Sequence, residues 1–315
     1  MEGPPEAEGK RDPRTIMQAV LIAALIVGVG IISYAVYANS PGKGTNTGPA
    51  IKSGDLVTMD YIGRLADGRV FDTSLLNVAR DNGLYPKSLT FSLRSNSSYI
   101  PFNMTAGNYG SSGGTIKGFA LGVIGLHEGD HAVIDVKPGD GYAVNPGNIR
   151  TVTLVQELPI YDVIPVDQFR LTFNAEPVPM HTYPHFFWKW DVLVVAEDPT
   201  SVLVKQIPAV GQVVYPFGDP NNQANPLGWP VVVESYDLAA NGGNGLITVR
   251  HELAPSQAGH VEGTDIDGQA FILTGVNTTD GTFELHRSDA ATNYNAELAG
   301  VELFFEVTIE KVLSI

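Results

Sequence analysis

Glycine and proline interrupt this chain so often that few stretches can form a long helix. The 315 residues include 34 Gly and 21 Pro, and the apolar runs between them are short. Short apolar runs bounded by turn-forming residues are typical of β-strands. At roughly 100–200 residues per domain, the length accommodates two domains. We therefore expect an α+β chain whose folded part consists mostly of strands.

The charge balance and the missing cysteines exclude several classes of protein. A formal net charge of −15 argues against nucleic acid as a partner, because phosphate recognition needs clustered Lys and Arg. Without Cys, the chain can hold neither a disulfide framework nor a thiolate metal site. It also lacks a Gly-x-Ser-x-Gly elbow, a metal-binding motif and a phosphate loop, which disfavours a hydrolase. We expect no metal and no cofactor.

An uncharged apolar stretch over residues 16–37 has the length of a transmembrane helix. At about 1.5 Å per residue it crosses a hydrocarbon core of about 30 Å. It also exceeds the roughly 7–15 apolar residues of an ordinary signal peptide. Basic residues precede this stretch, so the positive-inside rule places residues 1–15 in the cytoplasm. The protein would then cross the cell membrane once, and the residues after the stretch would lie outside the cell. The alternative is a signal peptide cleaved near Val36-Tyr37-Ala38.

Residues 38–50 predict a flexible linker after this stretch. Gly, Pro, Ser, Thr and Asn dominate there and cannot bury enough apolar surface to pack. The folded part then begins near Ile51. Asn-x-Ser/Thr sequons at Asn96, Asn103 and Asn277 agree with an extracytoplasmic face, although such triplets are common by chance.

The first folded segment predicts a β-hairpin. Residues 56–62 alternate as a strand, and Asp67-Gly68 supplies a tight turn toward a second strand near Phe71. Further elements follow downstream. They are strands over residues 89–93, 131–136 and 301–312, and a short helix over residues 117–127.

Runs that lie far apart in the chain share their order and spacing with one known family. They are Gly54–Gly63 with Phe71–Ser74, then Thr115–Phe119, and finally Phe304–Val307. Together they resemble the FKBP family of peptidyl-prolyl cis/trans isomerases. The long gap before the last run resembles the insert-in-flap (SlyD-like) branch and its archaeal long-type members. This resemblance implies an FKBP-like antiparallel half-barrel around a short helix, with a large β-rich domain inserted in the flap.

The resemblance also divides the folded part into domains. Residues 51–147 and 291–315 would form a discontinuous isomerase domain, and residues 148–290 would form the inserted domain. Asn293–Gly300 resembles the run that leads the last strand in archaeal long-type members, but Ala296 and Glu297 replace its His and Pro. The insertion is also larger than theirs, so the resemblance covers its fold only in part.

The isomerase pocket is assigned by this resemblance as well. Phe119 would be the floor of the pocket, where many relatives have Trp, and its walls would be Tyr61, Phe71 and Phe305. Asp72 would face the substrate amide. Hydrogen bonds to the substrate would come from Ile116 and Tyr142. A carboxylate beside an apolar wall needs a hydrogen-bond partner, which the Tyr61 hydroxyl would supply. For any one of the aromatic residues, the alternative is an ordinary place in a β-barrel core.

Rotation about an X-Pro bond needs neither a nucleophile nor a metal ion. The uncatalysed step breaks amide resonance behind a barrier of about 18–20 kcal/mol. A dry aromatic pocket lowers that barrier, because the planar, polarised amide loses more solvation than the twisted, less polar one. Shape complementarity to the twisted proline adds preference for the transition state.

The inserted domain contains an aromatic segment over residues 180–190. Exposed aromatic patches bind unfolded chains, and the inserted domain does this in SlyD-like relatives. We therefore expect a client-binding surface made of Phe186, Phe187, Trp188 and Trp190. The alternative is that these side chains form the core of the inserted domain.

These observations predict a monomeric, membrane-anchored isomerase (rotamase) and folding chaperone. Its clients would be unfolded or proline-containing polypeptides outside the cytoplasm. The alternative function is a catalytically inactive FKBP-like structural or binding module on the cell surface.

Overall fold

The computed structural model describes residues 48–110, 113–218, 228–289 and 295–314. They form two compact units. One runs to Ala143 and resumes at Gly300, and the other spans Val144–Ala299. The borders expected after residues 147 and 290 therefore move to residues 143 and 299.

The predicted transmembrane helix, residues 16–37, lies outside the described residues. So do the predicted tail, residues 1–15, and most of the predicted linker, residues 38–50. Among the residues that are described, no helix is long and apolar enough to cross a membrane.

The first unit is built on a five-stranded antiparallel sheet. Its elements are β1 (Leu56–Leu65), β2 (Val70–Thr73), α2 (Leu76–Arg80), β3 (Phe102–Thr105), α3 (Lys117–Gly122), β4 (His131–Val136) and β17 (Leu303–Leu313). β1 pairs with β17 along one edge and with both β2 and β3 along the other. β17 also pairs with β4, so the last strand of the chain lies inside the sheet.

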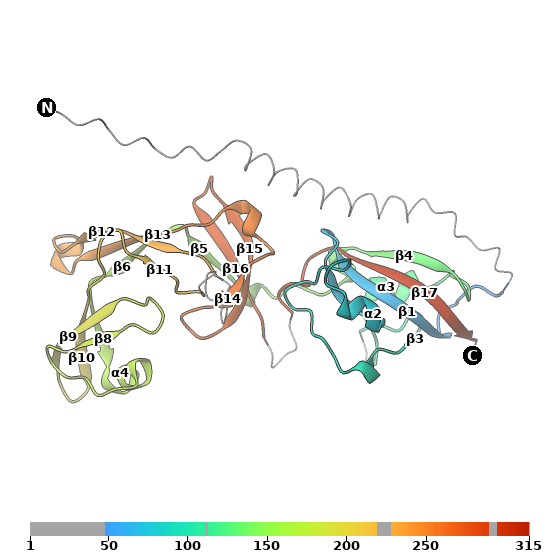
Figure 1. Cartoon of the computed structure of the whole chain (residues 1–315), viewed down its shortest axis with the longest axis horizontal. Coiled ribbons are helices and arrows are strands. Elements are labelled where there is room, and N and C mark those ends of the chain that lie inside the picture. Colours follow the sequence, from blue (N-terminus) through green and yellow to red (C-terminus); the bar gives the residue numbers. More distant parts are fainter. Residues whose placement is uncertain (1–47, 111–112, 219–227, 290–294, 315) are drawn as a thin grey trace, which may run out of the picture. The chain divides into compact units, whose positions relative to one another are not determined.

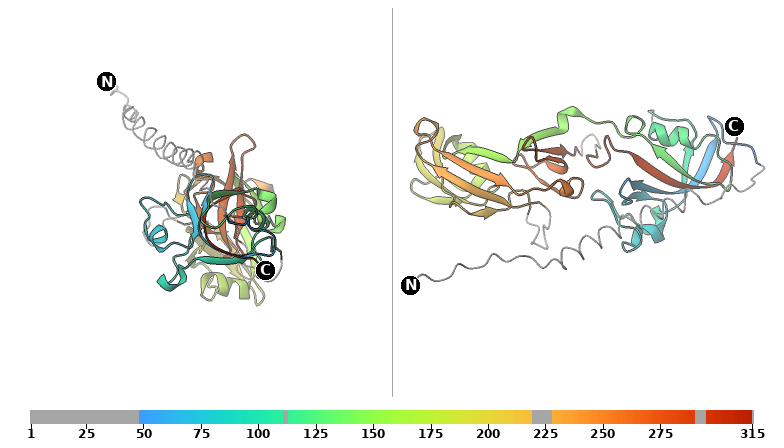
Figure 2. Two further views of the ribbon diagram at one scale, coloured as in Figure 1. Left: turned by 90° about the vertical axis from the view of Figure 1, so that its right-hand side faces the viewer. Right: turned by 90° about the horizontal axis from the view of Figure 1, so that it is seen from above.

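The pairing of β1 with β17 joins segments that are far apart in the sequence. Leu56 lies opposite Leu313, and Leu65 lies opposite Leu303. Figure 1 shows the blue β1 beside the red β17, and Figure 2 shows the same pairing from two other directions. Alternate side chains of β17 are buried from Leu303 to Ile309, so one face of this predicted strand lies in the core.

The predicted hairpin between β1 and β2 is confirmed. Gly68 has a φ of 88°, which a non-glycine residue rarely adopts, and its N–H donates to the Leu65 carbonyl at 2.9 Å. The Leu65 N–H in turn donates to the Arg69 carbonyl. The Asp67-Gly68 signal therefore identified this turn correctly.

Helix α3 is shorter than predicted. It ends at Gly122 instead of His127, and Gly125 then has a φ of 92° that a helix does not contain. Glycines let the helix approach β4 closely. A Cβ atom at Gly122 would lie 2.2 Å from the Cγ2 of Ile134, and one at Gly118 would lie 2.7 Å from the Cγ1 of Val136.

The predicted strand over residues 89–93 is wrong. Leu89 and Thr90 lie in a turn, and the Phe91 N–H donates to the Ser88 carbonyl. Leu93 is 61% exposed, so alternation here does not mark a buried face. The next strand after β2 is β3, further along the chain, and it pairs with the first residues of β1.

The second unit contains three four-stranded antiparallel sheets. Their orders are β7-β10-β9-β8, β11-β12-β13-β6 and β14-β15-β16-β5. The elements are β5 (Ile149–Thr153), β6 (Val155–Pro159), β7 (Tyr161–Pro165), α4 (Val166–Phe173), β8 (Thr182–Pro184), β9 (Asp191–Glu197), β10 (Ser201–Gln206), β11 (Val213–Val214), β12 (Val231–Asp237), β13 (Leu246–His251), β14 (Glu262–Thr264), β15 (Ala270–Asn277) and β16 (Thr282–Arg287). Short 3₁₀ turns occur at Asn96–Ser98, Pro138–Asp140, Pro146–Asn148, Asn241–Gly243 and Pro255–Gln257.

A buried polar network lies in the core of the second unit. Trp229 is fully buried, and its Nε1–H donates to the Nδ1 of His251 at 2.9 Å. Indole nitrogen can only donate, so Nδ1 must be the unprotonated nitrogen and Nε2–H must donate to the Gln156 Oε1 at 2.8 Å. The histidine is therefore neutral, and burial lowers its pKa from 6.5 to about 3.

Acid is expected to destabilise the second unit through His251. The unfolded chain binds a proton below about pH 6.5, whereas the folded state excludes it until about pH 3. The contribution of His251 to the free energy of unfolding is therefore complete above about pH 6.5. Below that pH it falls by about 1.4 kcal/mol per pH unit. Denaturant unfolding between pH 7 and 4.5 should show this slope. His251→Gln should reduce this slope by about one proton; a slope that stays the same in His251→Gln would contradict the assignment.

Candidate functional site

Aromatic side chains from four elements of the first unit meet around Phe305. The Phe305 ring on β17 stacks on Phe119 of α3 with centroids 4.3 Å apart. It meets Phe71 of β2 edge-on at 5.5 Å and Tyr61 of β1 at 6.2 Å. Tyr61 and Phe119 are also 6.2 Å apart. The structure thus brings together all the aromatic residues that the sequence assigned to the floor and walls.

Local backbone features explain how these rings can approach one another. Gly63 of β1 lies opposite both Phe305 and Asp72. A Cβ atom on Gly63 would lie 2.6 Å from the Phe71 ring, so only glycine leaves room for that ring. Phe71, Phe119 and Phe305 are buried.

Phe102 on β3 belongs to the same cluster and was missed by the sequence analysis. Its ring lies 5.8 Å from Tyr61 and 6.3 Å from Phe119, and the residue is 36% exposed. Because β3 has only four residues, its alternation is too short to predict a strand. Tyr61 and Phe102 form the more exposed edge of the cluster, where a substrate could enter.

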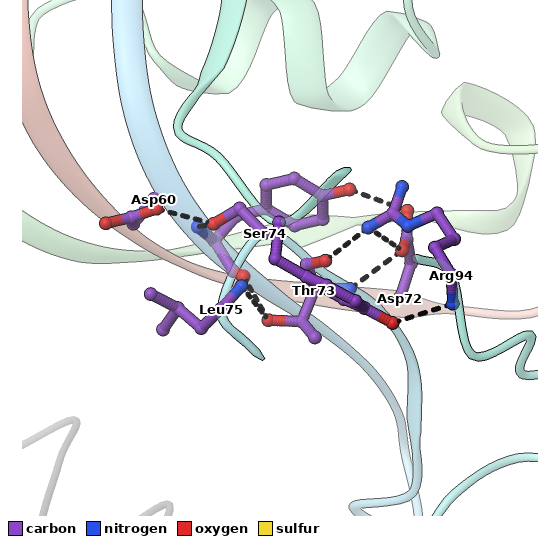
Figure 3. Close-up of polar contacts among 8 residues, drawn as sticks. Asp60, Asp72, Thr73, Ser74, Leu75 and Arg94 are labelled. Carbon is purple, nitrogen blue, oxygen red and sulfur yellow. Dashed lines mark hydrogen bonds and ion pairs between the residues drawn. The ribbon is translucent and has the colours of Figure 1, made fainter. Parts of the chain in front are cut away.

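The Asp72 carboxylate lies at this edge and is held from several sides (Figure 3). Its Oδ2 accepts a hydrogen bond from the Tyr61 hydroxyl at 2.6 Å, and its Oδ1 accepts the Thr73 N–H at 2.8 Å. Arg94 forms an ion pair with Oδ1 at 3.1 Å. The Tyr61 hydroxyl therefore holds the carboxylate as the sequence analysis expected, and Arg94 is an additional partner that it missed.

Hydrogen bonds also fix the end of β2 against β1. The Ser74 hydroxyl donates to the Asp60 carboxylate at 2.7 Å and accepts the Tyr61 N–H at 2.9 Å. The Thr73 hydroxyl donates to the Tyr61 carbonyl at 2.8 Å. These bonds hold the backbone on both sides of the Asp72–Tyr61 contact (Figure 3).

The Tyr61 hydroxyl is protonated throughout the physiological range. Its burial raises its pKa well above the ordinary value of 10, and the neighbouring negative charge of Asp72 raises it further. Tyr61 is therefore a permanent donor to the carboxylate.

Ile116 and Tyr142 lie near the site without joining the aromatic cluster. Ile116 is the extended residue before α3, and no hydrogen bond connects its N–H to another described residue. Tyr142 is 40% exposed. Burial raises the pKa of its hydroxyl, and the negative charge of the Asp72 carboxylate raises it further.

The aromatic segment of the second unit differs from the expected client-binding surface. Phe187, Trp188 and Trp190 are buried in the core, and the two Trp rings stack with centroids 5.0 Å apart. The Trp190 Nε1–H donates to the Gln206 Oε1 at 2.6 Å. Burial therefore withdraws these three side chains from any surface, and only Phe186, which is 45% exposed, remains accessible.

The described parts of the chain contain no group of three or more His, Asp or Glu residues placed to hold a metal ion. The aromatic site is composed of rings, one ion pair and hydrogen-bonding groups. Such a site can bind and desolvate an apolar amide segment.

Comparison with known proteins identifies the family of the first unit. A family model described as FKBP-type peptidyl-prolyl cis-trans isomerase matches residues 48–151. The short-type peptidyl-prolyl cis-trans isomerase of Methanocaldococcus jannaschii is 35% identical over 109 residues, which cover 35% of this chain and 58% of that protein. FK506-binding protein 1A of Aspergillus fumigatus is 33% identical over 127 residues, or 38% of this chain and 88% of that protein.

A longer relative shares only this part of its sequence. FK506-binding protein 4 of Chaetomium thermophilum is 29% identical over 119 residues, which are 37% of this chain and 19% of that protein. The chain thus spans less than two thirds of the length of this relative and of the archaeal one.

The sheet, its few short helices and the aromatic site define an FKBP-like domain. The chain belongs to the FKBP-type peptidyl-prolyl cis-trans isomerase family. The match ends at residue 151, and β17, which carries Phe305, comes only after the second unit.

Proposed function

We propose that the first unit catalyses cis/trans isomerisation of X-Pro bonds in polypeptides. The observation that supports this most strongly is the convergence of Tyr61, Phe71, Phe119 and Phe305 beside the held carboxylate of Asp72. The rings come from strands β1, β2 and β17 and from helix α3, and together they form one apolar surface.

Each group has a distinct role in this proposal. The aromatic rings take the proline and its amide out of water, which favours the less polar, twisted amide over the planar one. The Ile116 N–H binds a substrate carbonyl beside the reacting bond, and the Tyr142 hydroxyl donates a second hydrogen bond. Asp72 faces the rotating amide, with the Tyr61 hydroxyl fixing its orientation. No covalent bond is formed or broken.

A protease-coupled X-Pro assay on the full chain tests this function. We expect the wild type to accelerate cis-to-trans conversion and Phe71→Ala to approach the uncatalysed rate, with circular dichroism confirming that the variant is folded. Two relatives are named FK506-binding proteins, so we expect FK506 to inhibit the wild type. A wild type no faster than Phe71→Ala would instead favour the alternative, an inactive FKBP-like binding module.

We also propose that the second unit corresponds to the insertion of the insert-in-flap branch and binds unfolded clients. It enters the chain between β4 and β17 of the isomerase sheet. Large apolar side chains around α4 and β8 are exposed, with Leu171 80%, Met180 75%, Val178 46% and Phe186 45% accessible. Exposed apolar surface of this kind supports binding of non-native chains.

Charges near this surface indicate which clients it would favour. Helix α4 also contributes to a hollow of about 360 Å³ lined by Arg170, Glu176 and Asp198 among others. Arg170 already pairs with Asp167 and Glu176, so the excess charge there is negative. Client segments that combine apolar and basic residues should therefore bind best.

Substitutions on the exposed surface test client binding. Leu171→Ser combined with Met180→Ser should weaken binding of a fluorescently labelled, permanently unfolded polypeptide about tenfold, as expected for losing roughly 1.4 kcal/mol of contact. The matched control is Leu238→Ser combined with Val210→Ser, which changes similarly exposed apolar residues of the same unit. Equal losses in both pairs, or none in either, would contradict a client site at α4 and β8.

The membrane anchor and extracytoplasmic location form a separate proposal. They are supported by the uncharged stretch over residues 16–37 and by the basic residues before it. The full chain should sediment with membranes after alkaline extraction, whereas a chain starting at residue 38 should stay in the supernatant. Release of the full chain would contradict the anchor.

A further inference from the structure

Methionine is the only source of sulfur in this chain, because the sequence contains no Cys. Five methionines are present, and the structure describes Met59, Met104 and Met180. Met59 is fully buried in the first unit and Met104 is 6% exposed, whereas Met180 of the second unit is 75% exposed. Within the described part of the chain, a reagent dissolved in water therefore meets a single accessible thioether.

Met180 occupies a position of a β-turn where glycine is usually found. The His181 N–H donates to the Val178 carbonyl at 3.1 Å, which closes a turn with Pro179 and Met180 at its centre. Met180 has a φ of 64°, and proline fixes the preceding φ at about −65°, so the turn is of type II. A type II turn favours Gly or Asn at this position, because other side chains cost conformational energy there.

Backbone hydrogen bonds hold this strained turn against strand β9. The Met180 N–H donates to the Val194 carbonyl at 2.8 Å, and the Val194 N–H donates to the His181 carbonyl at 2.9 Å. The surrounding structure therefore fixes the backbone of Met180, while the residue remains largely exposed. Strained backbone positions of this kind occur often at functional sites. Met180 is therefore a candidate for a role beyond packing.

Met180 belongs to the exposed apolar surface around α4 and β8. Val178 in the same turn is 46% exposed, and Leu171 of α4 and Phe186 after β8 are 80% and 45% exposed. A methionine suits such a surface, because its unbranched, polarisable thioether adapts to partners of different shape. The thioether is also the group of this surface that peroxides oxidise.

We propose that Met180 is a site of selective, reversible oxidation by peroxides, and that its oxidation weakens client binding at this surface. A sulfur lone pair attacks one oxygen of hydrogen peroxide, and an S–O bond forms as the O–O bond breaks. The second oxygen leaves with both hydrogens as water. Sulfur is thereby oxidised by two electrons to the sulfoxide, and the peroxide is reduced by two. The effect on clients rests on the proposed client-binding function of the second unit.

The sulfoxide would change the surface without disturbing the core. Its oxygen is a polar acceptor, which an apolar client would have to take out of water without a hydrogen-bond partner. Because Met180 is mostly exposed, we expect thermal unfolding to be unchanged by its oxidation. Oxidation of the buried Met59 or Met104 would instead place a polar oxygen in the core of the first unit and destabilise it.

Mass spectrometry of the full chain treated with dilute hydrogen peroxide tests the selectivity. We expect the sulfoxide to form about tenfold faster at Met180 than at Met59 and Met104, because the buried sites react only when the structure opens. In denaturant the three rates should become similar, since burial is then lost. Equal rates at the three sites in the native protein would overturn the inference.

Client binding is then measured after removal of the peroxide, with a labelled unfolded polypeptide that contains neither Met nor Cys. The oxidised wild type should bind this probe about threefold more weakly, and methionine sulfoxide reductases should restore binding. Met180→Leu keeps an apolar side chain but no sulfur, so it should bind like the untreated wild type both before and after peroxide. Met180→Gln places a polar group in the same position and should bind weakly without any peroxide.

The outcomes distinguish this inference from the function on which it rests. If Met180→Leu lost as much binding after peroxide as the wild type, Met180 would not be the cause. A wild type that does not bind the probe before oxidation would overturn the proposed client function together with the effect on clients. The sulfoxide rates would in that case still decide whether Met180 is a selective oxidation site.

Discussion

Phe305→Ala is expected to abolish most of the isomerase activity and to destabilise the first unit. The ring contacts Phe119, Phe71 and Tyr61, so its removal opens the centre of the aromatic cluster to water. We expect kcat/KM to fall on the order of a hundredfold, which corresponds to about 2.7 kcal/mol of transition-state stabilisation. The cavity left by the ring should also lower the free energy of unfolding by about 3–5 kcal/mol. Activity and denaturant unfolding should be measured on the same preparation.

Matched variants separate the loss of chemistry from the loss of stability. Phe305→Leu keeps a large apolar side chain in the core but removes the aromatic face, so it should be more stable than Phe305→Ala and still impaired. Phe283→Ala removes an equally buried ring from the second unit and should leave activity unchanged below its unfolding transition. If Phe283→Ala lost as much activity as Phe305→Ala, the aromatic cluster would not be the site.

Gly122→Ala is expected to displace helix α3 from the sheet, although alanine is the better helix former. The new Cβ atom would lie 2.2 Å from the Cγ2 of Ile134, which is buried in β4. Intrinsic helix preference would add stability of about 1 kcal/mol, but overpacking typically costs about 1–3 kcal/mol, and this contact is far below van der Waals distance. Because Phe119 lies on α3, we expect lower stability and about tenfold lower activity.

Rescue by a second substitution identifies the cause. Ile134→Ala removes the atom that the new side chain meets, so Gly122→Ala combined with Ile134→Ala should be more active than Gly122→Ala alone. Gly139→Ala serves as the control, because a Cβ atom there has no neighbour within 4 Å. A stable and fully active Gly122→Ala protein would show that α3 tolerates a larger separation from β4 than its packing indicates.

Local sequence patterns identified much of the isomerase sheet. Alternation predicted β1 and β4, the Asp67-Gly68 turn predicted the first hairpin, and the apolar run near the end of the chain predicted β17. These patterns work because strand alternation and positive φ are properties of a few adjacent residues. In the second unit, the short apolar runs at residues 192–195, 231–233, 246–249 and 271–273 likewise lie in strands β9, β12, β13 and β15.

Other features depended on contacts that no local pattern contains. Phe102 reaches the site because β3 pairs with β1, and Arg94 reaches it by contacting Thr73, which lies 21 residues earlier in the chain. The strand predicted over residues 89–93 failed because alternation cannot show whether a partner strand is present. The aromatic segment at Phe187–Trp190 looked equally suited to a surface or a core until its burial was known.

Taken by itself, the sequence determined that the chain is rich in strands and carries the residue types of an isomerase pocket in family order. Only the tertiary structure decided which of those residues meet, because Tyr61 and Phe305 become neighbours through the pairing of β1 with β17. It likewise decided that Tyr61, Thr73 and Arg94 hold the Asp72 carboxylate and that three aromatic residues of the second unit are buried. The physical reason is that hydrogen-bond register and side-chain packing act between residues far apart in the chain, whereas composition and alternation describe only neighbours.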